Sequence, residues 1–195
     1  MINLLRQIAR TGNLTEATPQ PDEDLVGARD RIQREILDIL GQALTIRQVD
    51  AGSCNGCELE IHALNNAYYN LEGLGIRFVA SPRHADMLLV TGPVSRHMAE
   101  ALRRTYDATP EPRLVVAVGE CGCNGGIFGE SYASCGRVAN VIPVDVVVPG
   151  CPPPPLEILR GILGAVRRNG ARSPSHAPEG SAPPSPETRT PKARA

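Results

Sequence analysis

From residue 44 onward, short apolar runs alternate with longer stretches of helical periodicity. The runs are apolar throughout, which is typical of strands that are buried on both faces of a parallel sheet. They occupy residues 44–49, 76–80, 86–92, 113–119 and 144–150. Apolar residues at helical spacing predict helices at 58–74, 95–106 and 155–168. This alternation predicts a three-layer α/β fold, with a mainly parallel sheet covered by helices on both faces.

The two ends of the chain differ from this central pattern. Residues 1–43 hold two amphipathic stretches, 2–10 and 24–40, separated by a polar segment that contains prolines. We expect an N-terminal helical extension there, in which the apolar face of 24–40 packs on the core or on another subunit. Residues 169–195 contain six prolines and almost nothing apolar. Such a segment cannot offset the entropy lost on ordering, so we expect a disordered tail after a folded domain at 44–168.

Charge and composition limit the classes of function. The formal net charge is -1, from 20 basic and 21 acidic residues, and aromatic residues make up 3% of the chain with no Trp. Nucleic-acid binding is disfavoured, because neither a basic field nor rings for base stacking are present. No apolar run reaches the roughly 18–20 residues that a membrane helix needs. The first residues form no continuous apolar segment of the kind found in secretory signals, so we expect a cytoplasmic location.

Four of the six cysteines follow predicted strands. Cys54 and Cys57 come after the first strand, Cys121 after the fourth and Cys151 after the fifth. In an open parallel sheet, ligands bind beyond the carboxyl ends of the strands, which lie at one edge. Disulfides are a poor explanation in a reducing cytosol. The positions of these cysteines therefore predict that four thiolates converge on one inorganic centre.

Glycine and proline surround these cysteines, in the segments AGSCNGC at 51–57, GECGCNGG at 119–126 and PGCPPPP at 149–155. Glycines allow a close approach of the backbone and offer N–H donors to thiolates and sulfides, which suits an iron–sulfur cluster. Four thiolates also suit a zinc ion, but structural zinc sites usually pair two C-x-x-C knuckles, and this chain has one. We favour a cluster over zinc, and both over cysteines that are merely buried.

Two further cysteines and two acids lie near these motifs. Cys123 follows Cys121 by two residues and is an alternative ligand, whereas we interpret Cys135 as a small apolar residue. Glu58 and Glu60 lie at the start of a predicted helix, where negative side chains stabilise the N-terminus. Proton coupling to a redox event is the alternative role for these two acids.

The motifs CNGCELE at 54–60, GECG at 119–122, PGCPP at 149–153 and TGPV at 91–94 together resemble the small, electron-transferring subunit of [NiFe] hydrogenases. They also resemble its homologue, the 20 kDa subunit of respiratory complex I. The resemblance covers about residues 44–168. It implies a flavodoxin-like domain with one [4Fe-4S] cluster, proximal to the active site of a large partner subunit. By motif, the implied ligands are Cys54, Cys57, Cys121 and Cys151.

Two features narrow the resemblance. The complex I subunit typically has two adjacent cysteines in the first motif, whereas Cys54 and Cys57 form C-x-x-C as in hydrogenases. Uptake hydrogenases have a twin-arginine signal and a long C-terminal domain with two further clusters, which we do not expect here. The chain is instead similar to the small subunits of energy-converting hydrogenases and of formate hydrogenlyase. A complex I-like, quinone-linked subunit carrying the terminal [4Fe-4S] cluster is the alternative.

This resemblance also implies partners and a location. The expected partners are a [NiFe] hydrogenase-like large subunit, which holds the catalytic centre, a ferredoxin-like iron–sulfur subunit and integral membrane subunits. The chain would then lie in the cytoplasm, attached through its partners to the inner face of the cell membrane. No catalytic residue is expected in this chain itself. Of the two acids, the resemblance favours Glu60 for proton coupling, because related proteins place an acid similarly.

Overall fold

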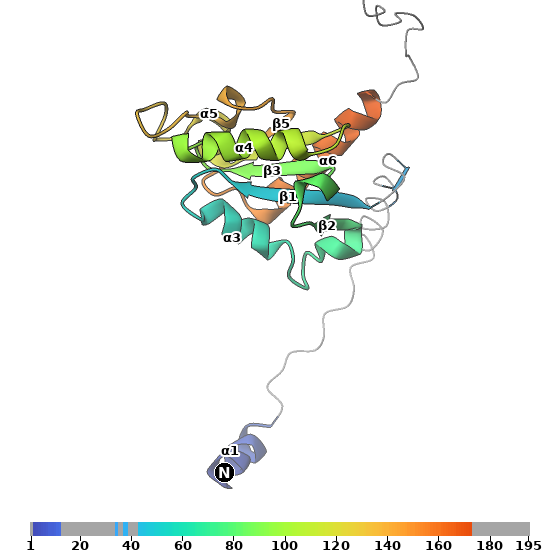
Figure 1. The fold of residues 1–195 in the computed structure, drawn as a ribbon. Helices are drawn as coiled ribbons and strands as arrows, with labels where there is room; N and C mark the ends of the chain where they lie inside the picture. The colour runs from blue at the N-terminus through green and yellow to red at the C-terminus, as the bar shows by residue number, and fades with distance from the viewer. Residues whose placement is uncertain (1, 13–33, 35–36, 39–42, 173–195) are drawn as a thin grey trace, which may run out of the picture.

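Five parallel strands form the centre of the molecule, a computed structural model that describes residues 2–12, 34, 37–38 and 43–172 (Figure 1). The strands are β1 (Leu44–Asp50), β2 (Ile76–Phe78), β3 (Met87–Thr91), β4 (Leu114–Val118) and β5 (Val146–Val148). Their order across the sheet is β2-β1-β3-β4-β5, and every pair is parallel. This is the flavodoxin-like order, which confirms the predicted fold class.

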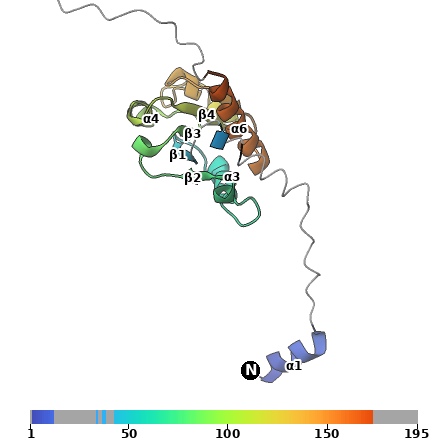
Figure 2. The ribbon, with the colours of Figure 1, turned by 90° about the vertical axis from the view of Figure 1, so that its right-hand side faces the viewer.

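Helices cover both faces of the sheet. Side chains alternate along β3, so Leu89 packs with α3 (Gly56–Ala63) and α6 (Pro155–Arg172), whereas Leu88 packs with α4 (Arg96–Ala108) on the opposite face. Figures 1 and 2 show these helices on either side of the strands. Both leucines are fully buried. Each such side chain contributes roughly 1.5–3 kcal/mol by leaving water, which is why both faces require an apolar run.

The predicted helix at 58–74 is shorter in the structure. Helix α3 ends at Ala63, and a separate 3-10 helix, η1, spans Leu71–Leu74. Between them the side chain of Asn66 accepts hydrogen bonds from the backbone N–H groups of Tyr68 and Tyr69, at 2.9 Å each. Asparagine side chains that bind nearby N–H groups compete with helical hydrogen bonds. The prediction of one continuous helix is therefore wrong, because this local competition ends it.

Two other helices depart from prediction. Helix α5 (Gly119–Asn124) was not expected, since glycine is unfavourable in helices and the segment contains two of them. Helix α6 continues to Arg172, four residues beyond the predicted end at Arg168. The first residues of the predicted tail are thus helical, and the remainder of that tail, 173–195, lies outside the described residues.

At the N-terminus, helix α1 spans Ile2–Thr11. The helix predicted at 24–40 lies mostly outside the described residues, although Arg34, Leu37 and Asp38 are helical. Two short 3-10 helices, η2 (Pro82–His84) and η3 (Val138–Asn140), complete the described elements. Within the described part of the chain, no helix is both long enough and apolar enough to cross a membrane.

Candidate metal centre

Four thiols lie around one small cavity at the carboxyl ends of the strands. The cavity has a volume of about 40 Å³ and is lined by Ser53, Cys54, Gly56, Cys57, Gly92, Glu120, Cys121, Gly150, Cys151 and Pro152. We call it the thiol cavity. Cys54 and Cys151 come from the loops after β1 and β5, Cys57 from the first turn of α3, and Cys121 from helix α5 after β4. The structure thus brings together the four cysteines that the sequence singled out, from segments up to 97 residues apart (151 - 54).

The loop after β1 is held by its own polar side chains. Asp50 ends β1, and its Oδ1 atom accepts hydrogen bonds from the N–H groups of Gly52 and Ser53, at 2.8 Å each. Asn55 then adopts a left-handed conformation with φ of 72° and begins helix α3. Cys57 consequently lies in the first turn of α3 and faces the thiol cavity.

Glu120 joins the two loops that carry the other thiols. Its backbone N–H donates to the carbonyl of Gly150 at 2.8 Å, and its Oε1 atom accepts from the N–H of Gly150 at 3.3 Å. The residue lies directly before Cys121, and Gly150 lies directly before Cys151. Glu120 therefore sets the spacing between these two thiols. This role was not predicted from the sequence, although Glu120 is part of the GECG motif.

Glycine is required at two places around the cavity. Gly119 has φ of 83°, and a Cβ atom there would lie 2.6 Å from the Sγ atom of Cys57. Gly92 has φ of 79°, and a Cβ atom there would lie 2.5 Å from the backbone nitrogen of Ser53. A side chain at either position would be strained and would displace the loop that carries Cys54 and Cys57. This cradle of thiols and glycine backbone fits a thiolate-bound cluster.

Two of the cavity thiols, Cys57 and Cys121, have raised pKa values in the metal-free protein. Burial raises the pKa of Cys57 to about 12, and the negative charges of Glu58 and of the other three thiols add to the effect. Burial also raises the pKa of Cys121, with Cys151 and Cys54 contributing. Deprotonation of Cys57 and Cys121 is therefore unfavourable, first because they are buried and second because of the neighbouring negative charge. A bound inorganic cation removes that penalty, since metal ligands must be thiolates.

The arrangement of the four cavity cysteines can be compared with what a zinc ion and an iron–sulfur cluster require. A tetrahedral zinc ion needs four sulfur atoms at about 2.3 Å from a single point. In the described part of the chain, no three His, Cys, Asp or Glu side chains are grouped as a single metal ion requires. The four cysteines instead surround a cavity. Four thiolates are also the ligand set of a [4Fe-4S] cluster, so the donor chemistry of the thiol cavity fits such a cluster.

The two remaining cysteines lie away from the cavity lining. Cys123 is half-buried, and its Sγ atom lies 3.7 Å from the carbonyl oxygen of Ala117, to which it donates a hydrogen bond. Cys135 packs at the edge of the apolar cluster under α4. Positions two residues apart on a helix project in nearly opposite directions. Cys121 thus lines the cavity from α5, whereas Cys123 does not.

The two candidate acids lie in different surroundings. Glu58 is only 5% exposed, and its Oε1 atom accepts a hydrogen bond from the hydroxyl of Thr91. Its Oε2 atom is buried with no hydrogen-bond partner among the described residues. Glu60 is only partly buried. The acid that the structure buries next to a cavity thiol is therefore Glu58, although the resemblance favoured Glu60.

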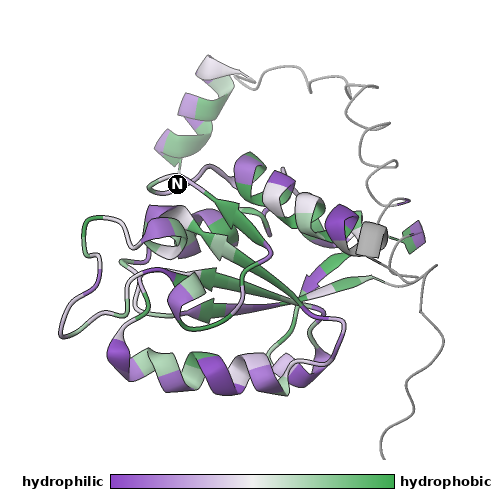
Figure 3. Cartoon of the chain, turned by 90° about the horizontal axis from the view of Figure 1, so that it is seen from above, coloured by the Kyte–Doolittle hydropathy of each residue, from purple (hydrophilic) through white to green (hydrophobic). Residues whose placement is uncertain are grey.

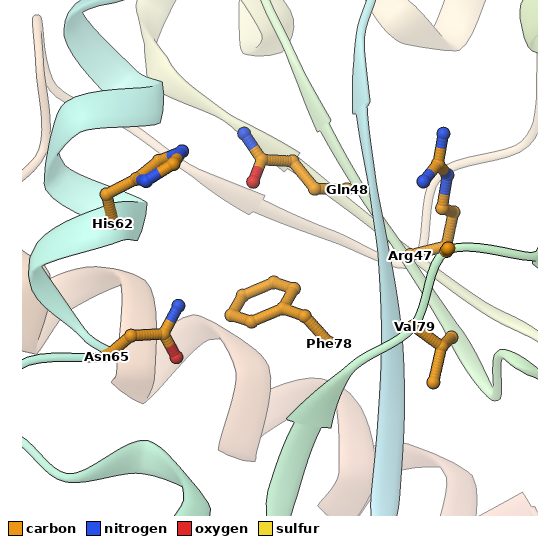
Figure 4. A pocket seen from close by; sticks show the side chains of 7 residues that line it. Arg47, Gln48, His62, Asn65, Phe78 and Val79 are labelled. Carbon is orange, nitrogen blue, oxygen red and sulfur yellow. The ribbon is translucent and has the colours of Figure 1, made fainter.

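A second, larger pocket of about 310 Å³ lies where the edge strand β2 ends (Figure 4). It is lined by Arg47, Gln48, His62, Asn65, Phe78, Val79 and Ala80. Figure 4 shows Gln48 on the side of His62, whereas Arg47 projects from the opposite side of β1. The Nε atom of Arg47 is buried without a hydrogen-bond partner among the described residues. None of the site residues predicted from the sequence lines this pocket.

Comparison with known families agrees with the geometry of the thiol cavity. The family model described as NADH ubiquinone oxidoreductase, 20 Kd subunit, matches residues 54–165, a range that contains all four cavity cysteines. The chain belongs to this family. It is accordingly an oxidoreductase-family subunit, as the sequence motifs implied.

Several curated relatives share much of this sequence. The "Probable membrane-bound hydrogenase subunit mbhJ" of Pyrococcus furiosus is 42% identical over 143 residues, which cover 72% of this chain and 86% of the relative. Formate hydrogenlyase subunit 7 of Escherichia coli is 40% identical over 69% of this chain and 53% of its own length. An NADH-quinone oxidoreductase subunit of Desulfovibrio desulfuricans is 50% identical over 55% of this chain and 58% of its own length.

Solved structures show the same fold. A chain of the membrane-bound sulfane sulfur reductase, an archaeal respiratory membrane complex, superposes with a TM-score of 0.61 at 33% identity. The superposition covers 71% of this chain and 78% of that one. A chain of an NAD+-reducing [NiFe]-hydrogenase superposes with a TM-score of 0.50 at 20% identity, over 71% of this chain and 97% of that one. The second match supports the fold alone.

Proposed function

We propose that this chain is the electron-transferring small subunit of a multisubunit, membrane-associated [NiFe] hydrogenase. In this proposal, it holds one [4Fe-4S] cluster. The ligands are Cys54, Cys57, Cys121 and Cys151. The observation that carries the proposal is the convergence of these four thiols, from three strand ends, around one cavity.

The bound cluster would supply one-electron transfer, and the chain would set the conditions for it. Glu120 holds the loops of two ligands at a defined spacing. Gly119 allows the Cys57 thiol to lie against the backbone. Glu58 places a buried carboxylate beside Cys57. Negative charge near a cluster and the exclusion of water both alter its reduction potential.

The surface around the thiol cavity has features that support the binding of a partner subunit at this edge. Cys54 and Cys151 are exposed, so another protein must cover this edge to keep water from the cluster. Exposed apolar side chains lie next to the ligands in the sequence: Leu59 on α3, Ile127 and Phe128 after α5, and Leu156 on α6. Exposed apolar side chains close to a functional site are typical of an interaction surface. We assign this edge to a large subunit that holds the catalytic centre.

The relatives support the nature of the whole complex. Their names include a membrane-bound hydrogenase subunit and a formate hydrogenlyase subunit. We therefore propose a ferredoxin-like subunit as the next electron carrier, and integral membrane subunits that attach the complex to the inner face of the cell membrane. The 50% identity to a subunit of NADH-quinone oxidoreductase favours a second candidate, a quinone-linked complex I-like subunit. We rank the complex I-like candidate second because Cys54 and Cys57 have the C-x-x-C spacing of hydrogenases.

Metal analysis of the anaerobically purified complex tests this proposal. We expect about four iron and four sulfide per copy of this subunit after subtraction of partner clusters, nickel in the large subunit, and an EPR signal on reduction. Iron without nickel would indicate the complex I-like candidate. Zinc in place of iron would refute electron transfer by this chain.

Proton coupling requires a separate test. We propose that an acid at the start of α3 takes up a proton during turnover, with Glu60 as the candidate named from the resemblance. Glu60→Gln is expected to slow proton-coupled turnover while the iron content and the EPR signal stay at the level of the unmodified complex. Unchanged turnover in that variant would remove Glu60 from the mechanism.

A further inference from the structure

Helix α1 exposes a continuous apolar face. Its larger apolar side chains are all more than half exposed: Ile2 at 68%, Leu4 at 60%, Leu5 at 62% and Ile8 at 56%. No residue of α1 is buried against the described part of the chain. Figures 1 and 2 show the helix apart from the sheet, and Figure 3 shows green and purple residues on different sides of it.

The apolar and charged residues of α1 are fully segregated. At about 100° per residue, Ile2, Leu4, Leu5 and Ile8 fall within an arc of roughly 160°, and both arginines fall outside it. These arginines, Arg6 and Arg10, are the only charged residues of the helix, which contains no acid. An isolated helix of ten residues is only marginally stable in water. The helix therefore requires a surface that covers its apolar face.

We infer that α1 binds the surface of an anionic lipid bilayer. A basic amphipathic helix lies in the interfacial plane, with its apolar face among the acyl chains and its basic residues at the headgroups. Arg6 lies about 40° and Arg10 about 80° beyond the Ile2 edge of the apolar arc. Their guanidinium groups can therefore reach anionic phosphates while their aliphatic stems extend toward the interface. The uniformly positive charge favours lipid over an apolar protein groove. The inference rests on the proposed function for the presence of a membrane, and it adds a direct contact to attachment through partners.

Vesicle flotation of the anaerobically purified full chain tests the inference. We expect the chain to float with vesicles of phosphatidylcholine containing about one third phosphatidylglycerol, and to bind phosphatidylcholine alone more weakly. Replacing both Arg6 and Arg10 by Gln is expected to lower binding to the anionic vesicles by about fivefold per arginine. The same double variant should not alter binding to phosphatidylcholine.

Two glutamate substitutions provide a matched pair. Ile8→Glu and Gln7→Glu add the same charge, but Ile8 lies on the apolar face and Gln7 on the polar face. Gln7→Glu is expected to lower binding about fivefold, and Ile8→Glu at least tenfold further. Equal effects of the two variants would overturn the inference, because they would leave charge as the only determinant. A wild-type chain that does not float with the anionic vesicles would also overturn it.

The same samples separate this inference from the proposed function. Iron content and visible absorbance of the wild-type chain report on the cluster, independently of vesicle binding. An intact cluster without flotation would overturn the membrane contact and leave the electron-transfer proposal standing. Flotation of a chain that cannot hold iron would overturn the electron-transfer proposal and leave the membrane contact standing.

Discussion

Substituting Ala for Gly119 is expected to remove the cluster while leaving most of the fold intact. The new Cβ atom would lie 2.6 Å from the Cys57 Sγ atom. Carbon and sulfur need about 3.5–4 Å, so the sulfur must move by roughly 1 Å. Metal–ligand distances tolerate only about 0.2 Å. The φ of 83° adds about 1–2 kcal/mol of backbone strain for an L-residue.

The assay for Gly119→Ala is the iron and sulfide content of the purified complex, together with the EPR spectrum after reduction. Gly122→Ala is the matched control, because it lies in the same helix and its Cβ atom would approach no atom closer than 3.6 Å. We expect the control to retain its iron. A Gly119→Ala complex with full iron content and an unchanged spectrum would refute the argument that the thiol must lie against bare backbone.

The same geometry predicts the outcome of three other changes. Cys121→Ser should lose or alter the cluster, whereas Cys123→Ser should retain its iron and EPR signal; the reverse pattern would reassign the ligand. Thr91→Val should destabilise the protein by about 1–3 kcal/mol in urea denaturation, because the buried Glu58 carboxylate loses its hydrogen-bond donor; an unchanged midpoint would show that the bond contributes nothing. In the metal-free chain, the pKa of Cys57 rises from 9.0 to about 12 on folding, so the folded state keeps a proton that the unfolded state releases. Stability should therefore be full below about pH 9 and fall as the pH rises toward 12, and Cys57→Ala should flatten this loss; urea midpoints at about pH 8 and about pH 10 measure it.

The strands and their class could be predicted from the sequence alone. Each of the five apolar runs became a strand whose bounds lie within two residues of the prediction. Such strands are buried on both faces, so consecutive residues such as Leu88 and Leu89 are both apolar. The edge at which the cysteines gather also followed from the sequence, because parallel strands share one carboxyl edge.

Helical detail near the site was less predictable. Helix α5 was absent from the predicted elements, and its packing against the sheet outweighs the low helix propensity of its two glycines. The Asn66 side chain ended α3 early, through hydrogen bonds that the apolar periodicity does not show. Both errors arose where local hydrogen bonding or tertiary packing outweighed the hydrophobic pattern.

The sequence by itself determined which residue types gather at one edge of a parallel sheet. Only the tertiary structure decided how they face one another. Cys121 rather than Cys123 reaches the thiol cavity, and Glu58 rather than Glu60 is buried beside a thiol. Glu120 proved to join two ligand loops 30 residues apart. Hydrophobic patterning is a property of neighbouring residues, whereas the direction of a side chain in a short loop or helix depends on contacts between distant segments.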